Sequence, residues 1–516
     1  MRVWRISDAV EAHKQHDVKT SPQPASSRKR SRKHASAAKG TACVTKSVKE
    51  NEEKVKAETK SEANKDETGN IASDMDTIVT SASGAAVHYD AITLSNVANR
   101  DSVQSIDLLG ARRLNNWIKE IVMQAAVGAL VRVHPGRKTA LAVLDLAGGR
   151  GGDVGKFQRC VERAGTALKA YGAADVSEAS VAEARARAEV ALSSLGEMRV
   201  LVVCDMARES ALSHIQFAYA KKDIVRDRAM RLSLALNPGN PFADGRFRLA
   251  WSAYALHYFA CGVDALRNHL RCVSRALEPG GLFVATYVSA ESIIRRLARA
   301  SKEESDTEFV EAESSLWRIQ MSKETLKRAV QCLEKGARMT STMGYGLRYR
   351  FWMPARAAPG GYLVNGDEVE EFLLFDDELM RQAQAFGLRP VFEAVHGDII
   401  QHAGRTRFGG DMMRGMGICR KSTDTNDDDL PSQVSPKDYD LASFYKTVAF
   451  SSCIMKAGAL VQNEESVLKM AIQLAESRRG SQPCDALGVA MAHDLGLPKN
   501  EALPYPVPAL DDTETE

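Results

Sequence analysis

One stretch, Val143 to Phe157, constrains the fold more than any other part of the chain. It reads VLDLAGGRGGDVGKF, so a strand-like run containing Asp145 opens into four glycines within five positions and closes on Asp153. Glycine at this density is typical of a backbone that turns sharply or lies against a ligand. We therefore predict a buried strand, a ligand-binding loop and a helix that begins at about Asp153.

The same order of strand and helix recurs along the chain. Helical spacing of apolar residues marks RRLNNWIKEIVMQAAVGAL, where Leu114, Trp117, Ile118, Ile121 and Val122 share one face. After the glycine loop come the strand-like runs ALKAYGAADVS, MRVLVVCDM and FRLAWSAYALHYF, with helical segments following them, and then EPGG before the strand LFVATYV. This alternation predicts right-handed βαβ units, and hence an α/β fold with a doubly wound parallel sheet and helices on both faces.

The two ends of the chain have a different composition. Residues 1–84 are rich in charge and poor in large apolar side chains, so we predict a disordered arm. Within it, RKRSRK (residues 28–33) is a basic cluster typical of a nuclear import signal, although a merely solvated charge run has the same composition. Residues 456–516 are expected to hold one helix, capped by Asn463 and Gly480, and then a polar tail.

Several further features limit the class of protein. Residues 305–420 are less regular, and about 422–438 are acidic and expected to form a flexible insertion. The nine cysteines show no CxxC spacing, so we expect no metal site, and Cys160, Cys204, Cys261 and Cys272 are expected to be core thiols. No stretch approaches the ~20 apolar residues of a membrane-spanning helix, so no membrane association is expected.

The glycine loop does not match the common phosphate-binding loops. Gly149 and Gly151 are followed three positions later by Val154, which breaks the dinucleotide pattern, and no Gly-Lys-Ser/Thr is present. An acid at a strand end followed by glycines two apart is the pattern that holds the aminoacyl part of S-adenosylmethionine (SAM). Asp205, after the third strand, can accept a hydrogen bond from the adenine amino group. An unrelated nucleotide-binding α/β domain is the alternative.

Polar and aromatic side chains are expected near this loop. Asn115 and Lys119 are four residues apart on one helix and so project from the same side. The fourth strand carries Tyr254, His257 and Tyr258 at its carboxyl end, where they can enclose a planar base. Core packing is the alternative explanation for each aromatic residue, and an exposed face is the alternative for Asn115 and Lys119.

Several segments in order resemble the eukaryotic mRNA cap guanine-N7 methyltransferases. They are HYDAI with NRDSVQSIDLLGARRLNNWIK, then VLDLAGGRGGD, ADVS, HYF, EPGG, EEFLLF and SFYKTVAF, and the similarity covers about Val87 to Phe450. The resemblance implies a class I SAM-dependent methyltransferase domain over about 85–455, including a cap-binding insertion or lid. It also implies nuclear location, capped mRNA as substrate, and a guanylyltransferase or RNA polymerase II as partner.

The resemblance assigns roles to particular positions. The residues implied to bind the cofactor SAM are Lys119, Asp145, Ala147, Gly149, Gly151, Asp153, Asp175, Asp205, Ala253 and Tyr258. Those implied to bind the cap are Asn115, Arg150, Lys156, Arg185, Tyr254, His257, Tyr258, Glu371 and Tyr445, with Arg150, Lys156 and Arg185 facing its phosphates. Guanine N7 has no proton to lose, so no catalytic acid, base, nucleophile or metal is implied, and Asn115, His257 and Glu371 act by positioning.

Three positions depart from the family pattern. Ala147 stands where glycine is usual, Ala253 stands where glutamine is usual, and the acid expected at the end of the second strand aligns with Gly172. Asp175, three residues on, is expected to replace that acid. The departures leave two alternatives: another SAM-dependent methyltransferase, acting on a small molecule or a protein, and a catalytically silent subunit that binds caps or RNA.

Overall fold

The computed structural model describes residues 90, 106–133, 140–219, 240–301, 307–336, 343–352, 369–419, 434–453 and 483–498. All of them belong to one compact unit, Ile71–Glu516. The predicted arm over residues 1–84 and the predicted helix over residues 463–480 lie outside the described residues. Among the described helices, none combines the length and the apolar character needed to cross a membrane.

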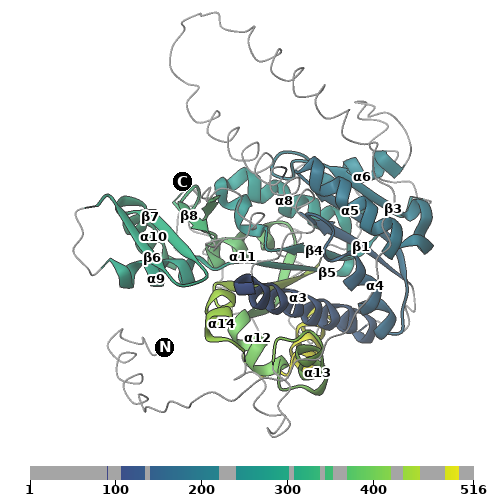
Figure 1. Ribbon diagram of the computed structural model, residues 1–516. Coiled ribbons are helices and arrows are strands. Elements are labelled where there is room, and N and C mark those ends of the chain that lie inside the picture. Colours follow the sequence, from purple (N-terminus) through teal and green to yellow (C-terminus); the bar gives the residue numbers. More distant parts are fainter. Residues whose placement is uncertain are drawn as a thin grey trace, which may run out of the picture. The chain divides into compact units, whose positions relative to one another are not determined.

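A seven-stranded sheet forms the centre of the fold (Figure 1). Its spatial order is β10 (Leu388–Val395), β11 (Tyr445–Ser452), β5 (Leu277–Val288), β4 (Phe247–Ala253), β1 (Leu141–Leu146), β2 (Leu168–Asp175) and β3 (Arg199–Val203). Strands β3, β2, β1, β4 and β5 are parallel, which confirms the predicted parallel sheet. Strand β11 runs antiparallel to both of its neighbours, a reversal that the apolar pattern of SFYKTVAF does not encode.

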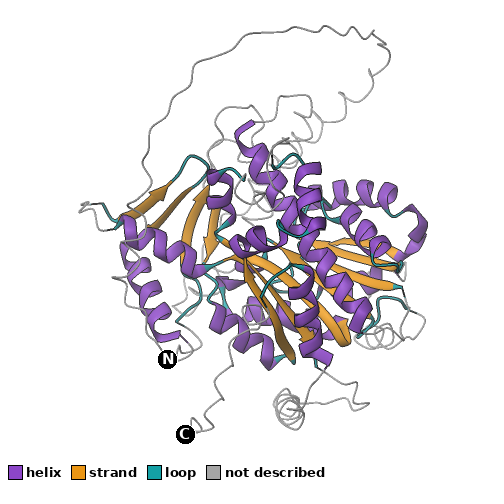
Figure 2. Cartoon of the chain, turned by 90° about the horizontal axis from the view of Figure 1, so that it is seen from below, coloured by secondary structure: helices purple, strands orange, loops and turns teal. Residues whose placement is uncertain are grey.

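Helices cover both faces of this sheet, as predicted (Figure 2). One face packs against α3 (Ile106–Val133), α4 (Val154–Arg163), α5 (Glu178–Ala191), α12 (His396–Ala403), α13 (Arg407–Gly415), α14 (Pro436–Ala442) and α16 (Pro483–Asp494). The other packs against α6 (Ala211–Tyr219), α8 (Val263–Ala276) and α11 (Asp376–Ala385). Every residue of β1 is buried, as a strand covered on both faces requires.

A second sheet occupies the region expected to be irregular. It is antiparallel, in the order β6 (Phe309–Glu313), β7 (Arg318–Ser322), β8 (Arg348–Trp352) and β9 (Val369–Phe372). Helices α9 (Ala290–Ala300) and α10 (Lys323–Lys335) share its apolar core. The expectation of irregular structure over 305–420 is therefore wrong. A bridge between Ser289 and Leu374 connects the chain after β5 to the chain after β9.

Three smaller expectations also need correction. EPGG lies within β5, where a bulge accommodates it, because Phe247 pairs with Leu277 while Leu249 already pairs with Leu282. The C-terminal region holds a buried helix, α16, whose Leu487 and Met491 join the core with α3, so residues 483–498 are not a polar tail. Pro436–Asp438, expected in the flexible insertion, begin α14.

Candidate functional site

The carboxyl ends of β1 and β4 both turn through a strained backbone. Ala147 follows β1 with φ of 58° and Tyr254 follows β4 with φ of 59°. These are left-handed conformations, which cost a residue with a side chain about 1–2 kcal/mol. Strain of this kind is concentrated at functional sites, where the surrounding structure maintains it. The two strand ends are neighbours, since β1 pairs with β4.

The glycine loop is held in place on one side and open on the other. Gly151 has φ of 70°, and a Cβ added there would lie 2.9 Å from the Cα of Ala184, so only glycine allows the loop to close against α5. The N–H of Gly149 donates to Asp175 Oδ2 at 2.8 Å. A Cβ added at Gly149 or Gly152 would meet nothing within 4 Å. The backbone at these two positions is therefore accessible to a ligand.

Asp153 is the centre of a buried charge cluster beneath the loop. Its Oδ1 contacts Lys119 Nζ at 2.7 Å and accepts from Lys156 Nζ at 2.8 Å, and its Oδ2 accepts from Trp251 Nε1 at 3.2 Å. Burial alone would raise the pKa of Asp153, but the charges and hydrogen bonds of the two lysines hold that pKa well below its usual range. Asp153 is therefore ionised and holds the Lys119 ammonium in place.

Lys156, implied by the resemblance to face the cap phosphates, is buried beside Asp153. Its side chain is 7% exposed, and its ammonium also donates to the carbonyl of Gly152 at 2.6 Å. Burial lowers its pKa, against the charge of Asp153. The ammonium is thus engaged inside the loop, and the contact between Lys156 and the cap phosphates stays a prediction.

Asp145 supports the loop from below. It is 1% exposed, and its Oδ2 accepts from the hydroxyl of Tyr171 at 2.7 Å. Burial, together with the negative charge of Asp153, raises the pKa of Asp145 to about 7. A Cβ added at Gly148 would lie 3.0 Å from this carboxylate, so Asp145 packs directly under the turn.

The acid at the end of the second strand is Asp175. Asp175 is the last residue of β2, and its two oxygens accept from the N–H groups of Gly149 and Ser177. Gly172 lies inside the strand, where an added Cβ would be 3.2 Å from the side chain of Ile215 on α6. An acid at Gly172 would point into an apolar core, so the alignment of Gly172 with the strand-end acid is wrong.

Asp205 lies at the next strand end along the sheet. It follows β3 by two residues, accepts from the N–H of Ala207 at 3.0 Å and contacts Arg208 Nε at 3.3 Å. Ala253, the last residue of β4, pairs with Thr286. Both residues therefore lie at the edge of the sheet where Asp175 and the glycine loop are found.

Aromatic side chains gather beside Lys119. The rings of Tyr254 and Tyr445 are 4.8 Å apart and nearly perpendicular, and Lys119 Nζ is 5.8 Å from the centre of the Tyr254 ring. The phenolic oxygen of Tyr254 is buried and has no hydrogen-bond partner among the described residues. Such an atom is costly unless a ligand or water satisfies it.

His396 belongs to this aromatic group, although no sequence pattern indicated it. Its ring stacks on the ring of Tyr445, with the two ring centres 5.7 Å apart, and its Nε2 is 3.1 Å from Thr447 Oγ1. Burial lowers its pKa to about 3, so the ring is neutral at ordinary pH. The neutral ring of His396 therefore packs against Tyr445 without adding charge to the aromatic group.

Glu371 meets the aromatic cluster from the second sheet. Its Oε2 accepts from Tyr349 at 2.6 Å and its Oε1 from Tyr258 at 3.2 Å, while His257 Nε2 is 3.5 Å away. Burial would raise the pKa of Glu371, but the charge of His257 and these hydrogen bonds lower it. Neither ring nitrogen of His257 has a well-formed hydrogen bond to a described residue. Tyr349, which the sequence did not indicate, pairs with Glu371 across β8 and β9.

His257 and Tyr258 do not lie on the fourth strand itself. They belong to a 3₁₀ helix, η2 (Leu256–Cys261), that follows the turn at Tyr254. Cys261, expected in the core, is half-buried at the end of this helix, whereas Cys160, Cys204 and Cys272 are buried. The tighter helix brings His257 toward β9 rather than continuing the sheet.

The remaining predicted site residues are Asn115, Arg150 and Arg185. The side chain of Asn115 is half-buried on α3, one turn from Lys119. Arg150 donates to Glu183 at 3.0 Å, and Glu183 also contacts Arg187. Arg185 is exposed on α5 and donates to the carbonyl of Leu201, in the middle of β3. The structure therefore does not bring Arg185 to the strand ends.

Comparison with known proteins identifies relatives of the chain. Residues 73–453 match the mRNA (guanine-N(7))-methyltransferase domain. A relative from Oryza sativa subsp. japonica, mRNA cap guanine-N(7) methyltransferase 1, is 26% identical over 272 residues, which are 52% of this chain and 58% of that protein. The mRNA cap guanine-N(7) methyltransferase of Drosophila melanogaster is 26% identical over 227 residues, which cover 42% of this chain and 46% of that protein. The chain thus spans about half the length of the relatives it matches.

The solved structures that the chain matches are more distant in sequence. The CcbJ methyltransferase of Streptomyces caelestis is 14% identical, with a TM-score of 0.32, over 64% of this chain and 90% of that one. An S-adenosylmethionine-dependent methyltransferase of Clostridium acetobutylicum is 12% identical, with a TM-score of 0.30. The match covers 63% of this chain and 90% of that one. The domain match covers most of the chain, and it is on this match that the chain belongs to the mRNA (guanine-N(7))-methyltransferase family.

Proposed function

We propose that this protein transfers a methyl group from SAM to N7 of the terminal guanosine of GpppN-capped RNA. The observation that carries the proposal is the buried carboxylate of Glu371, 3.5 Å from an imidazole, His257, whose ring nitrogens have no well-formed hydrogen bond to a described residue. The buried phenolic oxygen of Tyr254 likewise has no partner among the described residues. Lys119 connects this group to the glycine loop, because it contacts Asp153 and lies over the ring of Tyr254. Family membership supports the same activity.

The strand ends fit the proposed cofactor. The open backbone at Gly149 and Gly152 gives room for the aminoacyl part of SAM, and Lys119 offers an ammonium for its carboxylate. Asp175 suits the ribose hydroxyls and Asp205 suits the adenine amine, as carboxylates accept hydrogen bonds from both kinds of group. Ala147, Gly151, Ala253 and Tyr258 complete the proposed cofactor set, with Asp145 and Asp153 acting from beneath. SAM, when bound, supplies an electrophilic methyl group on a sulfonium.

Glu371 is proposed to select guanine. Its carboxylate can accept from both N1–H and the exocyclic amine of guanine, whereas adenine presents no donor at N1. The hydroxyls of Tyr349 and Tyr258 hold the carboxylate in one orientation. Tyr254 and Tyr445 offer ring surfaces to the base, and Asn115 and His257 offer the remaining polar contacts. Discrimination of this kind is strong because a mismatched base leaves a buried carboxylate unsatisfied.

The chain contributes to the reaction by positioning. Guanine N7 carries a lone pair and no proton, so no side chain needs to act as a general base. Holding the reacting atoms in line can contribute about 7–11 kcal/mol to lowering the barrier. The negative charge of Glu371 also favours the positive charge that develops on the base.

The rest of the proposal concerns the RNA and its setting. Arg150, within the glycine loop, is the proposed contact for the cap phosphates, because a guanidinium matches phosphate geometry. Capped mRNA is the proposed substrate, with a guanylyltransferase or the RNA polymerase II machinery as partner and the nucleus as location. The basic cluster at residues 28–33 supports nuclear import.

The proposal is tested by methyl transfer from labelled SAM to three RNAs, ended by GpppA, by ApppA or by an uncapped triphosphate. We expect label only on the GpppA-ended RNA, released by digestion as 7-methylguanosine. Equal labelling of all three RNAs would indicate a methyltransferase of another specificity. No labelling, together with no SAM binding by calorimetry, would indicate a protein that only binds caps or RNA.

A further inference from the structure

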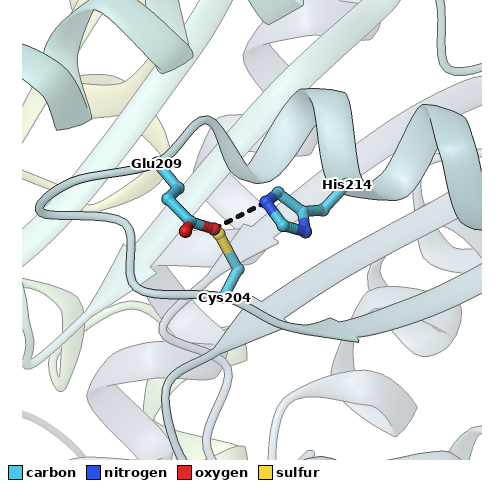
Figure 3. A group of neighbouring side chains, drawn as sticks. All are labelled: Cys204, Glu209 and His214. Atoms are coloured by element: carbon cyan, nitrogen blue, oxygen red, sulfur yellow. Dashed lines mark ion pairs between the residues drawn. The ribbon is translucent and has the colours of Figure 1, made fainter. Parts of the chain in front are cut away.

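The loop between β3 and α6 brings together three side chains of the kinds that bind zinc. They are Cys204, directly after β3, Glu209 in the loop and His214 on α6, spaced as Cys-x4-Glu-x4-His. One ligand atom from each lies within 4.8 Å of those of the other two. Figure 3 shows the sulfur, the carboxylate and the imidazole converging from these separate segments. We propose that these three residues form a binding site for a divalent cation of the zinc type.

The chemistry of the three donors favours zinc over harder cations. A thiolate, an imidazole nitrogen and a carboxylate oxygen are the ligands that Zn²⁺ uses in proteins, whereas Mg²⁺ and Ca²⁺ take oxygen ligands. Three protein ligands with water as the fourth form a common four-coordinate arrangement. The absence of CxxC spacing predicts no metal site, but this group contains a single cysteine and has a different spacing, Cys-x4-Glu-x4-His.

The geometry needs only a small adjustment to accept the ion. His214 Nε2 and Glu209 Oε2 are 2.7 Å apart, while two such ligands on a tetrahedral Zn²⁺ would be about 3.4 Å apart. The Glu209 side chain is 54% exposed and the His214 side chain 28% exposed, so both can separate by this amount. Their exposure also gives the ion a path of entry and leaves room for a water ligand.

The backbone beneath the site is already fixed. The N–H of Glu209 donates to the carbonyl of Asp205 at 2.8 Å, and the N–H of Cys204 donates to the carbonyl of Asp175 at 2.9 Å. Cys204 is 3% exposed, so its sulfur is held inside the fold. Binding of the ion would displace the thiol proton, because zinc is ligated by the thiolate. The bound ion would hold the start of α6 to the end of β3.

The test is a titration of the full chain, freed of metal by a chelator, with Zn²⁺ in competition against a chromophoric chelator and with Co²⁺ as spectroscopic probe. We expect one equivalent bound, release of a proton, and a thiolate-to-cobalt charge-transfer band. Cys204→Ser and His214→Gln should each weaken binding at least ~100-fold, since even changes outside the ligand set cost ~10–100-fold.

Two matched variants control for unrelated thiols and for unrelated histidine–carboxylate pairs. Cys160→Ser removes another buried thiol, and His493→Gln removes the exposed imidazole that contacts Asp494 at 3.4 Å. Both should bind the ion as the wild type does. If the wild type binds no equivalent, or if His214→Gln, with an unchanged circular dichroism spectrum, binds as tightly as the wild type, the proposal is overturned. His214→Gln decides the matter even if Cys204→Ser fails to fold.

Discussion

Ala147 holds the turn after β1 in a conformation that glycine adopts more readily than alanine. The left-handed backbone costs alanine about 1–2 kcal/mol, whereas the extra freedom that glycine loses on folding costs about 0.5–1 kcal/mol. The first cost is the larger. We therefore predict that Ala147→Gly raises the free energy of unfolding by about 0.5 kcal/mol, measured by urea denaturation.

The matched control for this prediction lies in the same strand. Ala142 is fully buried within β1 and is not among the residues with positive φ. Ala142→Gly should therefore lower the free energy of unfolding, by about 1–2 kcal/mol, through lost burial and added chain entropy. Changes of the same sign in the two variants would show that the turn at Ala147 is not strained.

At the scale of secondary-structure elements, β8 and β9 deliver Glu371 to the aromatic cluster. Tyr349, on β8, donates to Glu371 at 2.6 Å. A hydrogen bond to a charged acceptor contributes about 1.5–3 kcal/mol, so Tyr349→Phe should lower kcat/KM on GpppA-ended RNA at least ~10-fold while SAM affinity is retained. Steady-state kinetics and calorimetry measure the two effects.

Tyr287→Phe is the control at this scale. Tyr287 is also a fully buried tyrosine that donates to a carboxylate, Asp376, at 2.7 Å, but it belongs to β5 and takes no part in the proposed site. Loss of the Tyr287 hydroxyl should lower the free energy of unfolding without lowering kcat/KM. If both variants lose activity equally, the effect of Tyr349 is a general consequence of a weakened core.

Helices and strands with a strong apolar periodicity could be predicted from the sequence. Strands whose direction and register depend on pairing with other strands could not. The helical spacing of Trp117 and Ile118 correctly predicted α3, and the run of glycines correctly predicted the turn between β1 and α4. The reversed direction of β11 and the whole second sheet were missed, because short strands of mixed pattern take their register from their neighbours. The place of Tyr258 near the fourth strand predicted it as a site residue, whereas Glu371, 113 positions further along the chain, was predicted from the resemblance alone.

At the scale of the whole molecule, the buried carboxylates make stability depend on pH. The pKa of Asp145 is raised to about 7 in the fold, against about 3.9 in an unfolded chain. The folded state therefore binds more protons than the unfolded state between these values, and the contribution of Asp145 is lost as pH rises through 7. Asp153, with a lowered pKa, loses its contribution only below pH ~4.

Asp145→Asn tests this account. Between pH 5 and pH 8, the wild type should lose up to ~3 kcal/mol of unfolding free energy through Asp145, and the variant should lack that part of the decline. Urea denaturation at the two pH values measures the difference. Equal pH dependence in wild type and variant would mean that Asp145 is already ionised at pH 5.

The central claim is that Glu371 holds the guanine of an RNA cap beside the SAM-binding strand ends. The most direct measurement is kcat/KM of wild type and Glu371→Gln on GpppA-ended and IpppA-ended RNA, because inosine lacks the exocyclic amine. We predict that losing the amine costs the wild type ~10–150-fold, the value of a hydrogen bond to a charged acceptor, and costs Glu371→Gln much less. An equal loss in both proteins would contradict the claim, because the amine would then be read elsewhere.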